Sequence, residues 1–174
     1  MKKIALFLLF ALPFTAFAQD LKFGHIDRQE VIKLMPEFTT AQKTLEDLQL
    51  KYKEEISKLQ TEFQTKLADY QQNGDKLEAT IKASRESELQ RMQSNFQDFY
   101  QKAQDDLQAK EVDLMKTITD KLNKAIQEVG TENGFLYIFD VQGKTAETGP
   151  TTVLYYSPKS TDVAPLVKKK LNIK

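Results

Sequence analysis

The chain has 174 residues, with 25 basic and 25 acidic side chains, a single histidine and no cysteine. The missing thiols exclude a disulfide framework, a thiolate metal site and a cysteine nucleophile, and the balanced charge argues against a nucleic-acid-binding protein. There is no glycine-rich phosphate loop, and His25 has no second histidine or cysteine to complete a common zinc set. We therefore expect neither an enzyme nor a cofactor-binding protein.

Residues 1–18 have the pattern of a cleaved export signal. A basic start is followed by an apolar run over 4–14 and by the small-x-small segment 16–18, which signal peptidase accepts. The apolar run is shorter than the roughly 20 residues that cross a bilayer. We expect a mature chain that begins at Gln19 and carries 23 basic against 25 acidic residues.

The segment 19–36 predicts one strand and one short helix. Residues 21–27 alternate in strand fashion and place three side chains on one face, Leu21, Phe23 and His25. We expect His25 to be a half-buried residue of that sheet. Asp27 and Glu30 form an acidic capping box that predicts a helix start, and Pro36 suits the first turn of a second helix.

The segment 37–129 predicts two long antiparallel helices, called the arm from here on. It contains no proline, one glycine and many good helix formers. The only break signal is at 71–75, where Gly74 suits the position after a helix and Asp75 the cap of the next one. A tight turn there makes the two helices neighbours.

Apolar residues recur along the arm every eleven residues, which is 3.67 per turn and predicts a straight or slightly right-handed contact line. A turn at 73–74 pairs Ile56 with Met92 and Tyr52 with Phe96. Ile81 and Tyr100 lie on the same tracks. The main residues of this line, called the seam, are Leu45, Leu48, Tyr52, Ile56, Leu59, Phe63, Met92, Phe96, Leu107, Leu114 and Ile118.

Four large apolar arm residues lie off the seam tracks: Leu50, Phe99, Val112 and Met115. The predicted register brings Leu50 beside Phe99. Two hypotheses account for such a pair. It forms a binding patch for partner chains, or it packs on a neighbouring arm and widens the seam.

The segment 130–174 predicts a return to sheet structure. Strands are expected at 135–139 and 152–156, separated by a polar loop at 142–151, and a short amphipathic helix is expected from Thr161. Together with 19–36 this segment forms a small head, giving an α+β fold in which the arm projects from a sheet built by both chain ends. The candidates for the core of the head, or of an assembly of heads, are Phe23, Ile26, Leu136, Ile138, Val153 and Tyr155.

So small a sheet lacks a core of its own, and we expect the protein to self-associate through it. Near the chain end, the lysines at 168–170 form a basic cluster. They either complement the negative end of a helix dipole or make transient contact with an anionic membrane surface.

The order of these features resembles the Skp/OmpH family. The resemblance rests on segments 23–32, 35–37, 132–140, 153–156 and 162–171. It implies a periplasmic homotrimer of Gram-negative bacteria, with a β-barrel of three heads and three arms around a cavity that shelters unfolded outer-membrane proteins without ATP. The alternative function is a structural coiled-coil spacer or scaffold of the cell envelope.

Overall fold

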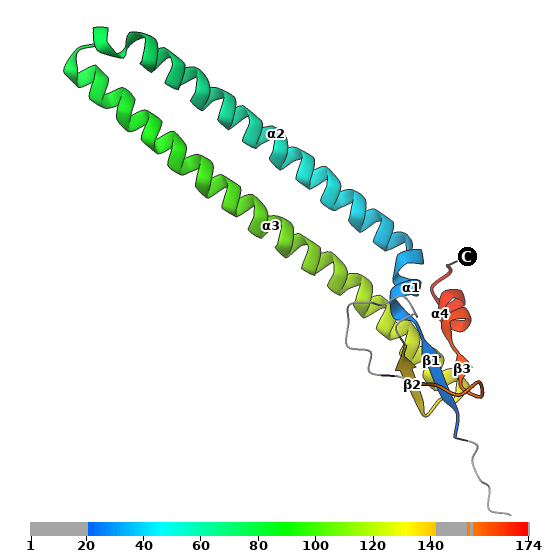
Figure 1. Ribbon diagram of the computed structural model, residues 1–174. Helices are drawn as coiled ribbons and strands as arrows, with labels where there is room; N and C mark the ends of the chain where they lie inside the picture. The colour runs from blue at the N-terminus through cyan, green and yellow to red at the C-terminus, as the bar shows by residue number, and fades with distance from the viewer. Residues whose placement is uncertain (1–20, 142–152, 154, 174) are drawn as a thin grey trace, which may run out of the picture.

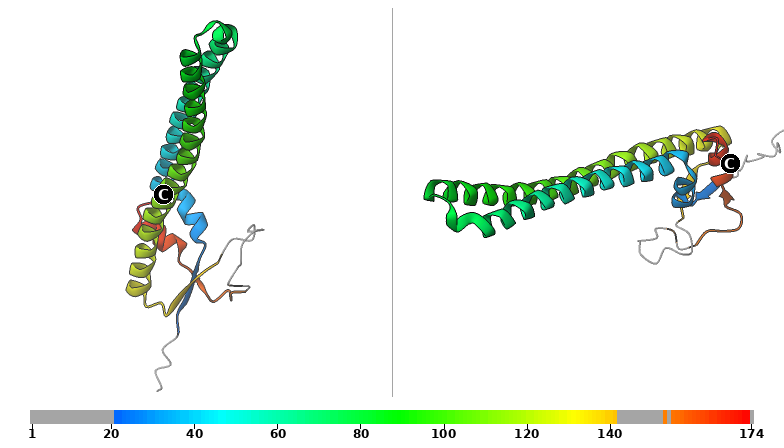
Figure 2. Two further views of the ribbon diagram at one scale, coloured as in Figure 1. Left: turned by 90° about the vertical axis from the view of Figure 1, so that its left-hand side faces the viewer. Right: turned by 90° about the horizontal axis from the view of Figure 1, so that it is seen from above.

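The computed structural model describes residues 21–141, 153 and 155–173 (Figure 1). The fold is α+β, with a small three-stranded sheet and two long helices that form a hairpin projecting from it, as the views of Figure 2 also show. In chain order the elements are β1 (Phe23–Ile26), α1 (Arg28–Leu34), α2 (Pro36–Asn73), the 3-10 turn η2 (Gly74–Lys76), α3 (Ala79–Asn133), β2 (Tyr137–Asp140), β3 (Thr161–Asp162) and α4 (Ala164–Lys170).

The sheet has the order β2-β1-β3, and β1 pairs in parallel with both neighbours. Phe23 lies opposite Tyr137 and His25 opposite Phe139. Parallel neighbours need a crossover connection, and between β1 and β2 that connection is the whole arm. Strands from the two chain ends therefore meet at the base of the arm.

Local capping explains how the chain enters the arm. The Asp27 carboxylate accepts a hydrogen bond from the Glu30 backbone N–H at 3.1 Å, so the predicted cap of α1 is present. Met35 is extended (φ −72°, ψ 132°) and fully buried, and Pro36 follows at the first position of α2. A residue before proline avoids the helical region, which separates α1 from α2.

A glycine ends the long helix. Gly134 lies in the left-handed region (φ 67°), where a residue without Cβ has no steric penalty. The Phe135 N–H donates to the Gly130 carbonyl at 3.0 Å and the Gly134 N–H to that of Thr131 at 3.4 Å, the pattern of a Schellman motif. The chain is thereby turned so that β2 runs beside β1.

The hydrophobic core lies where the sheet meets the base of the arm. It reaches into α3 as far as Ile118, a segment that the sequence assigned to the arm at 37–129. Its buried members are Ile26, Val31, Ile32, Met35, Ala41, Ile118, Leu122, Ala125, Val129, Val163 and Val167. The two chain ends and the base of the arm thus share one core.

The arm turn differs from the prediction. Gly74 is right-handed helical (φ −56°, ψ −34°) and begins η2, Asp75 lies inside η2, and Glu78 precedes α3 without a side-chain cap. A Cβ on Gly74 would lie 3.3 Å from the Tyr70 ring, so a larger residue here would press against that ring. The turn extends to Glu78, and α3 begins later than expected.

The C-terminal elements also differ. Residues 153, 155 and 156 are not in a strand, and 152 and 154 lie outside the described residues, as does the predicted loop at 142–151. Thr161 and Asp162, expected in a helix, instead pair with Gly24 and His25. The Asp162 side chain then accepts the Ala164 N–H at 2.9 Å, and α4 starts there.

Lysines of the basic cluster fasten α4 to its neighbours. Lys168 lies 3.5 Å from Glu30, and Lys170 binds Glu128 at 3.2 Å and also Glu132. The hydrogen bond to Glu132, with that to Glu128, raises the pKa of Lys170. Two of the three lysines therefore link α4 to α1 and α3.

We predict that Gly24→Ala destabilises the head. An added Cβ would lie 2.9 Å from Val163 Cγ1, and Val163 is fully buried and branched, so it cannot yield. Overpacking of this kind costs about 1–3 kcal/mol of unfolding free energy, measurable by urea denaturation.

The matched control is Gly130→Ala. Its Cβ would meet only Ile138 at an ordinary 3.5 Å, and within a helix this change should stabilise by about 0.5–1 kcal/mol. Equal effects of the two substitutions would contradict the packing argument.

Candidate functional site

Helices cover one side of the sheet, and none of the described helices covers the other. Gly24 and Ile26 point to the covered side and are buried. On the other side Phe23 stacks with Tyr137, with ring centroids 6.3 Å apart and planes 5° apart, and Phe139 lies 6.4 Å from Phe23. All three rings are exposed. With His25 and Tyr156 they make up what we call the open face.

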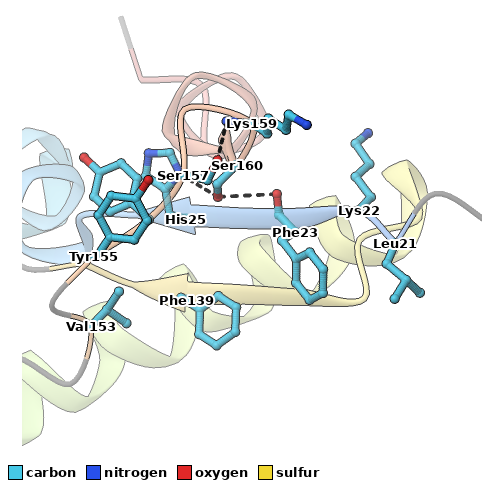
Figure 3. Close-up of a pocket in the computed structure, with 11 residues that line it drawn as sticks. Leu21, Lys22, Phe23, His25, Phe139, Val153, Tyr155, Ser157, Lys159 and Ser160 are labelled. Atoms are coloured by element: carbon cyan, nitrogen blue, oxygen red, sulfur yellow. Dashed lines mark hydrogen bonds between the residues drawn. The ribbon is translucent and has the colours of Figure 1, made fainter.

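A hollow of about 940 Å³ adjoins the open face (Figure 3). Figure 3 shows the rings of Phe23, Phe139 and Tyr155 and the imidazole of His25 around it. Most of its wall is apolar, which is the usual character of a surface that receives another apolar group. The hollow therefore suits an apolar partner surface.

His25 is the central polar group of this surface. Its Nδ1 lies 2.9 Å from the Ser160 hydroxyl, and its ring stacks on Tyr156 with centroids 4.1 Å apart. Ser160 Oγ also lies 3.5 Å from the Phe23 carbonyl oxygen. These contacts fix the imidazole in the open face, half-buried.

The predicted head core residues lie on both sides of the sheet. Ile26 is buried and Ile138 half-buried on the covered side, whereas Phe23, Leu136 and Tyr155 are exposed and Val153 is half-buried beside the hollow. Ile26 and Ile138 therefore belong to the core of the single chain, and the other four stay candidates for the core of an assembly of heads. The sequence grouped Phe23 with His25 correctly but left out Tyr137, Phe139 and Tyr156; the alternation of Tyr137 and Phe139 within one predicted strand was the available signal.

The seam is only partly shielded from solvent. Ile118 is buried at the base of the arm, and every other predicted seam residue is half-buried. Ile81 and Tyr100, on the same eleven-residue tracks, are exposed. Since α2 and α3 form a single layer, each side of the arm leaves apolar seam atoms accessible to solvent.

Polar bridges join the two helices along the length of the arm. The Tyr52 hydroxyl donates to Asp106 at 2.9 Å. Three further bridges link Tyr70 to Glu86, Lys66 to Glu88 and Lys121 to Glu37. Exposed bridges contribute little stability individually, so they set the register of the helices more than they hold them together.

The bridges shift the pKa values of their members. The hydrogen bond to Glu86 raises the pKa of Tyr70 to about 12. The hydrogen bond from Lys121 lowers the pKa of Glu37, and that from Lys66 lowers the pKa of Glu88. Each shift favours the protonation state that forms the bridge.

The predicted register of the arm is wrong. Tyr52 packs against Phe99, with ring centroids 5.9 Å apart in an edge-to-face arrangement, whereas the prediction paired it with Phe96. The cause is the longer turn, which delays the start of α3. Phe99 is half-buried in this contact, while Leu50 is 51% exposed, so the expected side-by-side pair does not form. Of the other off-seam residues, Val112 is exposed and Met115 packs on the core.

We predict that Tyr70→Phe removes the tyrosine that titrates near 12. Because the phenol pKa is raised, this bridge supports the arm fully below the unfolded pKa of about 10 and is lost as the pH rises through about 12. Ultraviolet absorbance titration of the phenolate measures this. Tyr100→Phe, at an exposed position, is the control and should leave the transition near pH 12 in place. Loss of the transition in this variant would contradict its assignment to Tyr70.

Two general features of the described residues bear on function. No helix among them is long and apolar enough to cross a bilayer. Nor do they contain a cluster of three or more His, Asp or Glu side chains that could hold a metal ion.

Comparison with known proteins identifies the family. No curated protein matches the chain. A family model described as outer membrane protein (OmpH-like) matches residues 22–171, a range that includes every described strand and helix. The resemblance seen in the sequence is thereby confirmed, and the chain belongs to the OmpH-like family.

Proposed function

We propose that this protein is an ATP-independent holdase that binds unfolded outer-membrane β-barrel proteins in the periplasm and prevents their aggregation. The observation that carries the proposal is the arm, whose polar helices leave a continuous line of half-buried apolar residues accessible. Membership of the OmpH-like family supports the same role. Residues 1–18, outside the described part, serve in this proposal as a signal peptide cleaved on export.

The proposal includes assembly of three chains through their heads into a β-barrel. The side of the three-stranded sheet that faces away from the helices carries exposed aromatic rings, and exposed apolar patches of this kind mark interaction sites. Copies of the chain would cover the open face and extend the sheet past β2 and β3. Three arms would then enclose a cavity.

Client contact in this proposal is made by the accessible edges of the seam. A half-buried residue such as Tyr52, Phe96 or Phe99 retains apolar surface without leaving the hairpin. Many weak contacts of this kind hold an unfolded chain by multivalency, and each can release without an energy source. Leu50 and Phe99 remain candidate contacts, now as separate ones, with Leu50 on the outer surface and Phe99 in the seam.

An envelope spacer is the alternative function. A spacer uses apolar arm residues only to join its helices, and it has no reason to expose Leu50 or Val112. Exposure of these side chains supports the holdase. Client protection by the purified protein separates the two functions directly.

Assembly is predicted to fail when the open face is made polar. Phe139→Ser, at a position 43% exposed in the single chain, should convert the trimer into a monomer in size-exclusion chromatography with light scattering. Ile81→Ser, which has a similar exposure of 46% but lies near the arm tip, should leave the trimer intact. A wild-type chain that is monomeric at micromolar concentration would refute the proposed assembly.

We predict that client protection depends on Leu50 and does not depend on nucleotide. The wild-type trimer should keep a urea-diluted outer-membrane protein soluble, equally with and without ATP. Leu50→Ser should reduce that protection while unfolding free energy changes by only about 0.5 kcal/mol, as for other surface substitutions. Lys51→Ser, at the exposed neighbouring position, is the control and should protect as wild type does.

Phe99→Ser should behave differently, because it removes the ring that packs on Tyr52. We expect a loss of about 1–2 kcal/mol in arm stability for a half-buried aromatic side chain, together with weaker protection. Full client protection by both variants would exclude these two contacts. No protection by wild type would favour the spacer.

A further inference from the structure

We propose that His25 makes the self-association of this protein sensitive to pH, so that protonation of its ring weakens the assembly. The inference rests on the proposed self-association through the open face. His25 is the only histidine in the chain, and it lies among the exposed rings Phe23, Tyr137 and Phe139 on that face. No other side chain in the sequence has an ordinary pKa close to 6.5.

The contacts of His25 accommodate a neutral ring. Nδ1 shares a hydrogen bond with Ser160, whose hydroxyl can either donate or accept, and Tyr156 covers one side of the imidazole. In the part of the chain that the structure describes, this is the only side-chain hydrogen bond recorded for His25. His25 is half-buried, so part of the residue contacts solvent in the single chain.

Covering the open face removes that solvent. A neutral imidazole can place its one proton on Nδ1 toward Ser160, and Nε2 is then an uncharged acceptor whose burial costs less than the burial of a charge. A protonated ring carries a donor on both nitrogens and buries a charge, which desolvation opposes. In an assembly of identical chains, every copy adds a further positive charge on the same apolar surface.

The neighbouring charged groups do not offset that cost. The only carboxylate in register with His25 is Asp162 of β3, and its Oδ1 already accepts the Ala164 N–H at 2.9 Å. At the end of β2, Asp140 lies 3.6 Å from Arg28 and is engaged there. Both carboxylates are therefore already engaged with other groups.

Among the described residues that line the hollow, the remaining ionisable groups are lysines and tyrosines. Lys22 precedes β1, and its ammonium binds the Asn133 carbonyl at 3.1 Å. Lys159 lies on the same rim as Tyr155 and Tyr156. Two lysines disfavour another positive charge, while the stacked Tyr156 ring gives the imidazolium only a modest cation–π attraction. The expected result is weaker assembly in acid.

The test is the dissociation constant of the assembly, measured by sedimentation velocity at about pH 8 and about pH 5.5, on either side of the ordinary histidine pKa of about 6.5. For the wild-type chain we expect the constant to rise at least about tenfold on acidification, since one pKa unit at one site corresponds to tenfold. For His25→Gln, whose amide can still pair with Ser160 but does not titrate, the ratio of the two constants should be near one.

Two further measurements sharpen the result. His25→Lys, which carries its charge at both pH values, should assemble weakly at both. The single histidine also gives one set of imidazole signals in proton NMR, and these signals should differ between the assembled protein and Phe139→Ser.

The outcomes separate the two proposals. A wild-type chain that assembles with the same constant at both pH values overturns the role of His25 and leaves the holdase proposal intact. Equal pH dependence in wild type and His25→Gln also overturns it, because another group is then responsible. A chain that is monomeric at both pH values overturns the assembly and the pH inference together.

Discussion

The rest of the molecule depends on one packed junction, where the last turns of α3 lie under the sheet. Ile118, Leu122, Ala125 and Val129 of this single helix contact a core supplied by both ends of the chain. Beyond that junction the arm has no comparable core, since its seam is half-buried and its bridges are exposed. The direction of the arm is therefore set by the head, through an unbroken helix.

The two sides of the head sheet differ, because helices pack against one side and exposed aromatic rings lie on the other. Val163 presses on Gly24 from the covered side, and α4 is tied down by Lys168 and Lys170. The other side carries stacked rings with no cover from the described residues. The covered side of the three strands thus contributes to the stability of the chain, and the open face is the side through which we propose that it associates.

Much of the architecture could be predicted from the sequence because it follows from local rules. Helix formers, the cap at Asp27 and the proline at 36 act within a few residues, and the structure has the helices they predict. The eleven-residue period likewise selected positions that are half-buried or buried, except Ile81 and Tyr100.

The errors arose where distant segments decide the outcome. Register along the arm depends on the length of the turn, and the packing of Tyr70 on Gly74 left no local signal. The role of Thr161 and Asp162 as a strand depends on backbone pairing with β1, more than a hundred residues away. Which side of the sheet is covered depends on where α3 and α4 pack, and alternation within a strand cannot reveal that.

β1 lies far in the sequence from β2 and β3, the strands it pairs with, and this separation affects the order in which the chain folds. The Lys22 ammonium binds the carbonyl of a residue 111 positions later, and β3 follows later still. Contacts so distant in sequence form slowly, whereas helical contacts form locally and fast. A chain that emerges from its amino end would complete the hairpin while β1 still has no strand to pair with. Until the carboxyl end arrives, β1 has no strand to pair with, and an unpaired strand with an aromatic side chain is a template for aggregation.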